Sequence, residues 1–303
     1  METLSSCLLC GGSNFSCVTR VGANFQGEAV NLCSGCGLVF LSPRMTASEL
    51  EDFYSSNAFS EEYRGGAEPD SAALAKREVR ISPRIEFLAE HVDLDTTKSA
   101  LEIGCSCGTF CAALRDRGVS EVLGVDPSAG YVKFGARHYQ LDLRHGTFPD
   151  ALTADDGPYD LIAIFHVLEH LPAPAVALAR MRDLLSHDGI LFIEVPDLER
   201  ALERKWLHRK YFHRAHLVDF TKETLKACVE NAGFEVIAIQ HALPDVACGQ
   251  STNDKNVMVL ARRSETLKGA SCWNPEHARA LRERIKARHN PPALKKWWAR
   301  LAK

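Results

Sequence analysis

Short apolar runs alternate with amphipathic stretches along the middle of the chain, from about residue 98 to residue 262. The runs at 99–105, 121–128 and 159–165 are rich in Val, Ile and Leu and end at Gly, Asp or a loop, as buried strands do. Between them apolar residues recur at helical spacing, and the first such stretch ends at Gly118. The alternation predicts an α/β domain built on a doubly wound, mostly parallel, seven-stranded sheet.

The pattern also predicts helices before the first of these strands and after the last of them along the chain. Thr46 and Glu49 have the spacing of a capping box ahead of an apolar stretch. Apolar positions over 71–91 predict one long helix with a kink at Pro83, and a helix over 174–189 is expected to end at its final glycine. The expected organisation is a small module over 1–45, a helical linker or lid over 46–97, the α/β domain over 98–262 and a basic helical tail over 263–303.

The composition is that of an ordinary soluble globular protein, with 46% hydrophobic and 25% charged residues. No apolar run reaches the roughly 20 residues that span a bilayer. The opening METLSSCLLCGG lacks the pattern of a secretory signal, so a cytoplasmic location is expected. Eleven cysteines, an odd number, then indicate thiols and metal ligands rather than a disulfide framework.

Charge is distributed unevenly along the chain. Residues 262–303 carry 12 Lys and Arg against 3 Glu, and because the total is −3, residues 1–261 carry −12. The acidic body argues against a general nucleic-acid binder. For the tail, two interpretations stay open: a helix packed on the sheet with a solvated basic face, or peripheral contact with a membrane surface, aided by Trp297 and Trp298.

Two CxxC pairs near the start of the chain indicate a metal site. Cys7 and Cys10 form the first pair, and Cys33 and Cys36 the second, each beside glycines that permit tight turns. Four thiolates suit a tetrahedral Zn²⁺, and such a closed site leaves no position for water. The spacing predicts a structural zinc ribbon, with reduced, exposed thiols as the alternative.

The ends of the predicted strands bring candidate chemistry to one edge of the sheet. After the first strand, Gly104 and Gly108 enclose Ser106 in a G-x-S-x-G turn, which allows a ligand close to the backbone. Glu102 precedes the turn and suits a ligand that carries an ammonium group. Asp126 ends the second strand, where a carboxylate takes the two hydroxyls of a ribose. An amino-acid end and a ribose end together describe S-adenosylmethionine.

The motifs LEIGCSCGTF, GVDPS, HGTF, YDLIAIFHVLEHLPAP and LLSHDGILFIEVPD occur in this order over 98–262. They resemble the successive motifs of class I S-adenosylmethionine-dependent methyltransferases, which have a Rossmann-like fold; Ser106 stands where that family usually has glycine. The segment CLLC…CSGCGLVFLSPR…ELEDFY resembles the zinc-binding module fused to sugar and natural-product methyltransferases, including deoxysugar C-methyltransferases. Those enzymes have a further C-terminal domain, and a Glu-His pair where this sequence has Ala215-His216.

The resemblance implies a set of cofactor contacts. Phe148 is expected to stack on the adenine and the backbone of Thr147 to read its amino edge, although Phe148 also suits plain core packing. His166 is expected beside the methionine end of the cofactor. The full set of implied cofactor residues is Glu102, Gly104, Cys105, Gly108, Asp126, Pro127, Thr147, Phe148 and His166.

The stretch HVLEH at 166–170 also fits a zinc-peptidase pattern, which needs a helix to aim both histidines at one metal. The following LPAP cannot sustain that helix, so this interpretation is disfavoured. By resemblance, Glu169 and His170 fix the loop after the fourth strand, and a divalent ion on these two residues stays open because some relatives hold one there.

Methyl transfer requires alignment of a nucleophile and removal of its proton. His216 is the candidate base because it matches the histidine position of the family, and His166 is the second catalytic candidate; a histidine that only fixes a loop is the alternative. Tyr54, Tyr63 and Arg64 are candidates to cover the substrate.

The expected function is therefore S-adenosylmethionine-dependent O- or C-methylation of a small-molecule or sugar-like acceptor in polysaccharide, glycolipid or natural-product biosynthesis. The alternatives are a non-catalytic zinc-ribbon protein with a Rossmann-like binding domain, and a protein or nucleic-acid methyltransferase.

Overall fold

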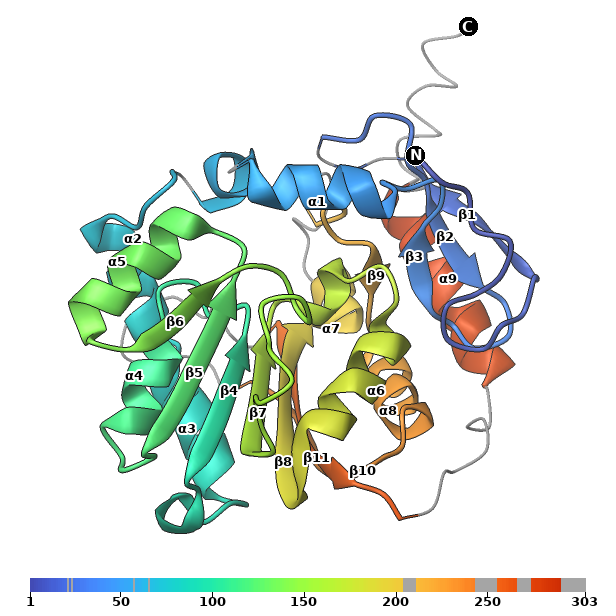
Figure 1. Ribbon diagram of the computed structural model, residues 1–303. Helices are drawn as coiled ribbons and strands as arrows, with labels where there is room; N and C mark the ends of the chain where they lie inside the picture. The colour runs from blue at the N-terminus through green and yellow to red at the C-terminus, as the bar shows by residue number, and fades with distance from the viewer. Residues whose placement is uncertain are drawn as a thin grey trace, which may run out of the picture.

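The computed structural model describes residues 1–20, 22, 24–56, 58–64, 66–203, 211–242, 255–265 and 274–289. Its larger sheet has seven strands (Figure 1) in the order β10 (Phe234–His241), β11 (Asn256–Arg263), β8 (Leu185–Pro196), β7 (Tyr159–Phe165), β4 (Ser99–Ile103), β5 (Glu121–Asp126) and β6 (Asp142–His145). Only β11 runs antiparallel to its neighbours, while β8, β7, β4, β5 and β6 pair in parallel. The predicted α/β, mostly parallel, seven-stranded sheet is confirmed.

The alternation of side chains along each strand supplies two buried faces. In β7, Ile162 and Ile164 face one hydrophobic cluster, whereas Leu161 and Phe165 face the other. One cluster includes α6 (Pro174–Leu184) and α8 (Lys222–Asn231), and the opposite one includes α3 (Ile81–Ala89) and α4 (Thr109–Arg115). The remaining helices are α1 (Ala47–Ser55), α2 (Ser71–Glu78), α5 (Ala129–Tyr139), α7 (Leu198–Glu203) and α9 (Pro275–His289), with short turns η1 (Ser60–Arg64), η2 (Leu94–Thr96) and η3 (Leu168–His170).

A second, antiparallel sheet joins segments that are far apart in the sequence. It has the order β1 (Phe15–Thr19), β2 (Val30–Cys33), β3 (Val39–Leu41) and β9 (Val218–Asp219). The last strand pairs with β3 through Phe40 and Val218, so the module is completed by a segment from beyond β8. The apolar face of α9 covers this sheet through Ala278, Leu281 and Ile285 (Figure 1). The described part of the basic tail thus packs on the N-terminal sheet; Trp297 and Trp298 lie outside the described residues.

Two predicted helices have different bounds in the structure. The single helix expected over 71–91 is divided into α2 and α3, and Pro83 lies in the first turn of α3, where its missing N–H removes no helical hydrogen bond. The helix expected to end at Gly189 ends at Leu184 instead. Gly189 lies inside β8, where an added Cβ would come within 2.8 Å of the Tyr159 carbonyl, so this glycine permits close strand approach rather than a helix stop.

The predicted capping box is confirmed: Thr46 caps α1 and pairs with Glu49. Thr221 caps α8 in the same way, with Thr224 as its partner. The helix α1 lies across the upper end of the larger sheet and leads from the N-terminal sheet toward α2 (Figure 1). Within the described residues, no helix combines the length and the apolar character needed to cross a bilayer.

Candidate active site and cysteine cluster

The two carboxylates predicted to bind cofactor lie on neighbouring parallel strands. Glu102 pairs with Gly124 across β4 and β5, and Asp126 ends β5 two residues later. The chain leaves β4 at Gly104, whose N–H donates to the Val125 carbonyl at 2.8 Å. Both acids therefore belong to the carboxyl edge of the sheet, where parallel α/β folds bind ligands.

The two glycines of the G-x-S-x-G turn are required for different structural reasons. Gly104 has a φ of +75°, and an added Cβ would come within 2.2 Å of Val167 Cγ2, so only glycine fits here. Gly108 has a φ of +76° and caps α4. An added Cβ there would approach Leu143 at 3.0 Å, so Gly108 allows close packing and does not line the hollows described next.

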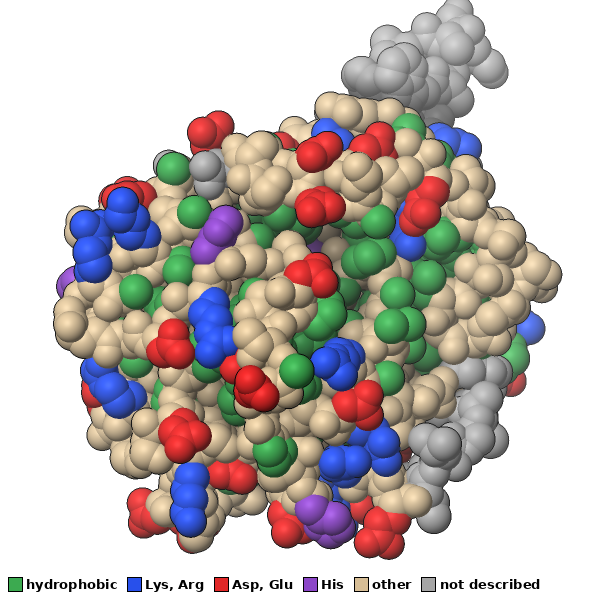
Figure 2. All heavy atoms as spheres, in the orientation of Figure 1, with side chains coloured by type: hydrophobic (Ala, Val, Ile, Leu, Met, Phe, Trp, Pro, Cys, Tyr) green, Lys and Arg blue, Asp and Glu red, His purple; other side chains and the backbone are tan. Residues whose placement is uncertain are grey.

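Two adjacent hollows open at this edge. The first, here the Asp126 hollow, has walls that include Asp126, Pro127, Gly146, Thr147 and Phe148. The second, the Glu102 hollow, is the larger of the two, and its walls include Arg80, Arg84, Glu102, Cys105, Ser106 and Thr109. They share the wall residues Phe59, Arg64, Gly104, His166, Val167 and His170. Two adjoining hollows at this edge form the kind of concave site in which small molecules bind. Figure 2 shows hydrophobic side chains gathered on the face below α1.

Burial changes the protonation of Glu102. Its side chain is 5% exposed, and the Cys111 thiol donates to Oε2 at 3.0 Å. Loss of hydration raises the pKa of Glu102 to about 7, because burial disfavours the charged carboxylate more than the thiol and Arg84 favour it. A cationic ligand in the Glu102 hollow would supply the missing counter-charge.

Asp126 has the opposite balance. Burial alone would raise its pKa, but the charge and hydrogen bonds of Arg64, with the N–H groups of Ser128 and Ser106, lower the pKa below its usual value. Arg64 Nη1 and Nη2 lie 3.3 and 3.4 Å from the two carboxylate oxygens. Asp126 is therefore ionised, and the structure places a guanidinium against it.

Charged residues of alternating sign surround His166, whose side chain lines both hollows. Glu194 accepts from Arg84 Nε at 2.7 Å and lies 3.3 Å from His166 Nε2. Glu169 Oε1 lies 3.6 Å from His166 Nδ1. Burial alone would lower the pKa of His166, but the two carboxylates raise it by more than burial lowers it, so the pKa lies above its usual value. His166 also has a φ of +55°, a left-handed conformation that is uncommon outside glycine and often found at functional sites.

Glu169 lies at the centre of a histidine cluster. His170 Nε2 and His216 Nε2 are each 3.9 Å from Glu169 Oε1, and both Glu169 oxygens are buried without a hydrogen bond. Asp219 Oδ1 lies 3.8 Å from His216 Nδ1. Burial lowers the pKa of His170 to about 4, so this imidazole is neutral near pH 7. His170 lines both hollows, whereas His216 lines neither and lies behind it, with ring centroids 4.9 Å apart.

The HVLEH stretch does not form the helix that a zinc peptidase requires. Residues 168–170 form the short turn η3, which ends at Leu171 in an extended conformation. Glu169, His170 and His216 have ligand atoms within 4.8 Å of one another, which is compatible with an ion at this place.

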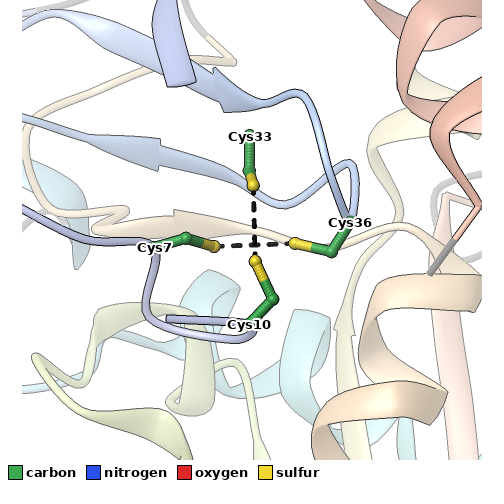
Figure 3. A group of neighbouring side chains, drawn as sticks. All are labelled: Cys7, Cys10, Cys33 and Cys36. Carbon is green, nitrogen blue, oxygen red and sulfur yellow. Dashed lines mark hydrogen bonds between the residues drawn. The ribbon is translucent and has the colours of Figure 1, made fainter. Parts of the chain in front are cut away.

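The four cysteines of the two CxxC pairs converge on one point (Figure 3). The Sγ atoms of Cys7 and Cys36 are 3.5 Å apart, as are those of Cys10 and Cys33. A tetrahedral site with Zn–S bonds of about 2.3 Å needs sulfur atoms about 3.8 Å apart, so the thiols fit a zinc ion. The second pair lies in the hairpin between β2 and β3, and Gly37, with a φ of +80°, closes its turn.

Two parts of the site were not found by sequence reasoning. The first is the ion pair of Arg64 with Asp126, since Arg64 was considered only as a substrate cover. The second is the pair of Arg84 with Glu194. A charged residue in the middle of the apolar run ILFIEVP was the available signal, because a buried charge needs a partner.

The comparisons with known proteins agree with this fold. The model of a family described as a methyltransferase domain matches residues 73–239, more than half of the chain. The chain therefore belongs to the methyltransferase-domain family.

Individual relatives are distant. A ubiquinone biosynthesis O-methyltransferase of Xylella fastidiosa is 30% identical over 115 residues, which cover 36% of this chain and 46% of the relative. A sphingolipid C9-methyltransferase of Candida albicans is 23% identical over 175 residues, which cover 52% of this chain and 34% of the relative. The chain thus spans about half, or less, of the length of these curated relatives.

A solved structure shares the fold over most of the chain. The 1,6-didemethyltoxoflavin-N1-methyltransferase of Burkholderia thailandensis, with bound S-adenosylhomocysteine, is 18% identical, with a TM-score of 0.54. The match covers 82% of this chain and 100% of that one.

Proposed function

We propose that the protein transfers a methyl group from S-adenosylmethionine to a hydroxyl-bearing small molecule, with a sugar-like acceptor of polysaccharide, glycolipid or natural-product biosynthesis as the favoured class. The observation that carries the proposal is the pair of buried carboxylates, Glu102 and Asp126, on neighbouring strands beside two adjoining hollows. The names of the curated relatives, a ubiquinone biosynthesis O-methyltransferase and a sphingolipid C9-methyltransferase, support a small acceptor over a protein or nucleic acid.

The cofactor contacts follow from the two hollows. Glu102 faces the ammonium group, and Gly104 forms part of the wall of both hollows. Asp126 takes the ribose hydroxyls, while Pro127, Thr147 and Phe148 enclose the adenine; Cys105 contributes a small wall of the Glu102 hollow. When bound, S-adenosylmethionine supplies an electrophilic methyl group on a sulfonium.

The acceptor contacts centre on aromatic rings. Tyr63 stacks near Phe59 with ring centroids 5.2 Å apart and lies 4.9 Å from His213. Such faces suit the C–H surface of a sugar or an aromatic ring. The Glu169 oxygens are buried without a hydrogen bond, and Oε1 lies 3.6–3.9 Å from nitrogens of His166, His170 and His216, so Glu169 supports this histidine wall rather than contacting the acceptor.

His216 is the proposed base. Carboxylates flank both of its nitrogens, Glu169 on Nε2 and Asp219 on Nδ1, and orient the ring. Because His216 lies behind His170 and lines neither hollow, it takes a proton from an acceptor only if His170 moves aside. The raised pKa of His166 favours a charged ring that holds the loop beside the cofactor. The divalent ion on Glu169 and His170 stays a prediction, and metal analysis of the purified protein addresses it.

Zn²⁺ in the cluster of Cys7, Cys10, Cys33 and Cys36 is proposed to be structural. All four positions of a tetrahedral ion are taken by sulfur, so the ion stabilises the N-terminal sheet and has no site for a reactant.

The function is tested by incubation of the protein with S-adenosylmethionine and panels of nucleotide sugars, lipid-linked sugars, phenols, proteins and RNA. Formation of S-adenosylhomocysteine together with one added methyl on a sugar or phenol is the expected result. Methylation of protein or RNA alone would contradict the proposed acceptor class. Cofactor binding without any methylated product would favour the non-catalytic alternative.

A pH dependence of cofactor affinity follows from Glu102. Because its pKa in the ligand-free protein is about 7, the carboxylate must lose a proton before it can pair with an ammonium. We expect calorimetric affinity for S-adenosylhomocysteine to rise between pH 5.5 and 7, by up to about tenfold per unit. Protonation has the opposite effect on the ligand-free fold: the folded pKa lies above the unfolded one, so this stabilising contribution is lost as the pH rises through about 7.

Glu102→Gln is the control, since it cannot titrate and should bind with a flat pH profile over this range. Equal wild-type affinity at pH 5.5 and 7 would contradict the role assigned to Glu102.

A further inference from the structure

Arg64 occupies the place where the proposed function puts the ribose of the cofactor. Its Nη1 lies 3.3 Å from Asp126 Oδ1 and its Nη2 lies 3.4 Å from Oδ2, so the guanidinium spans the carboxylate as a diol would. Its Nη1 also donates to Ser128 Oγ at 2.9 Å. Arg64 belongs to the shared wall of the Asp126 hollow and the Glu102 hollow.

The acceptor capacity of Asp126 is already filled. Oδ1 accepts from the Ser128 N–H at 2.8 Å and from Arg64, and Oδ2 accepts from the Ser106 N–H at 2.9 Å and from Arg64. A carboxylate oxygen offers two lone pairs, so each oxygen has its full complement of donors. Two ribose hydroxyls can bind Asp126 only if Arg64 leaves.

The segment that carries Arg64 is held over the hollows by several contacts. The strap is defined as residues 58–64 and 66–70, and within it the Phe59 ring lies 5.2 Å from the Arg64 guanidinium. On the other side, the Tyr131 ring lies 5.1 Å from it. Ser60 Oγ bonds Ser128 Oγ at 3.1 Å, and both side chains are buried.

The backbone of the strap also docks on α5. At Gly130, an added Cβ would come within 2.2 Å of the Ala67 carbonyl oxygen, so the close approach depends on glycine. Because this contact involves no charged group, a substitution at Gly130 can displace the strap while Arg64 and Asp126 stay unchanged.

We propose that the strap is an autoinhibitory gate: Arg64 closes the ligand-free site by binding Asp126, and the cofactor binds by displacing it. The proposal rests on the proposed function. Phe59 and Tyr63, which line the Glu102 hollow and are the proposed acceptor contacts, lie on the same strap. Release of Arg64 therefore changes the acceptor wall as well, which makes the cofactor the first ligand to bind.

The test compares S-adenosylhomocysteine affinity and hydrogen exchange in three variants. Arg64→Ala removes the competitor, and we expect about tenfold tighter binding, the scale of a charged hydrogen-bonded pair. Exchange of residues 58–64 should be faster in ligand-free Arg64→Ala than in the wild type, and the ligand should accelerate it in the wild type. Gly130→Ala should also increase the affinity for S-adenosylhomocysteine, although it changes no charge. Arg262→Ala, which removes an exposed pair with Glu235, should bind as the wild type does.

Other outcomes overturn the gate. Weaker binding by Arg64→Ala would make Arg64 a cofactor contact, and unchanged binding would show that it does not compete. Ligand-induced slowing of exchange in the wild-type strap would show that the strap closes on the cofactor instead of opening. If neither the wild type nor any variant binds S-adenosylhomocysteine, the proposed function fails, and the gate with it.

Discussion

Replacement of Asp126 by Asn is expected to weaken binding of S-adenosylhomocysteine by at least about a hundredfold. The carboxylate is 1% exposed, so the ribose hydroxyls lose two charge-assisted hydrogen bonds worth roughly 1.5–3 kcal/mol each. Titration calorimetry measures the loss. Asp188→Asn is a matched control, because Asp188 lies exposed in β8 at a distance from the hollows and bears the same chemical change.

The substitution also leaves Arg64 without its carboxylate, which gives a second measurable effect. Arg64 is largely buried, and removal of one partner from such a pair destabilises the fold. The double variant Arg64→Ala/Asp126→Asn removes both partners and is expected to recover thermal stability without recovering affinity. Affinity of Asp126→Asn within threefold of the wild type would contradict the assignment of the ribose to Asp126.

Loss of the metal from the cysteine cluster is expected to abolish methyl transfer while leaving most of the cofactor affinity. Structural zinc sites contribute roughly 10 kcal/mol or more of folding free energy. The affected sheet contains β9, and His216 precedes that strand by two residues. The Leu217 N–H bonds the Glu169 carbonyl at 2.9 Å, and the Leu41 N–H bonds the Leu217 carbonyl at 3.0 Å. Unfolding of β3 thus removes the support of the proposed base.

Chelation and Cys36→Ser provide the two forms of this experiment. Both should lower turnover by about a hundredfold or more and increase hydrogen exchange over 211–220, with S-adenosylhomocysteine affinity changed by only about fivefold. Cys17→Ser is the control, because Cys17 is exposed and lies outside the cluster. Full activity of a metal-free protein would show that the cluster is dispensable for the site.

The sequence predicted the larger sheet because its strands have strong local signals. The runs that become β4, β5, β7 and β8 are apolar on both faces, and the capping residues Thr46 and Thr221 satisfy backbone donors within three residues of themselves. The carboxylates Glu102 and Asp126 could be placed because each follows or ends such a strand. Local periodicity was sufficient for these features.

Long-range partners could not be predicted in the same way. The strand β9 has two residues and gains its conformation from β3, about 180 positions earlier, so no local pattern marks it. The short strand β6 consists of Asp142–His145 and has no apolar run. The ion pair between Arg64 and Asp126 forms because the strap crosses the edge of the sheet, and that crossing is set by tertiary packing rather than by local sequence.

The division of the N-terminal sheet between the two ends of the chain has a consequence during synthesis. The ribosome releases the four cysteines and β3 long before Val218 and Asp219 emerge. Until then the outer edge of β3, which is fully buried in the finished protein, is an open template for pairing with other nascent chains. If the two CxxC pairs bind zinc early, the metal holds the β2–β3 hairpin in register until β9 is made. Expression in zinc-depleted medium should therefore increase the fraction of newly made protein that aggregates.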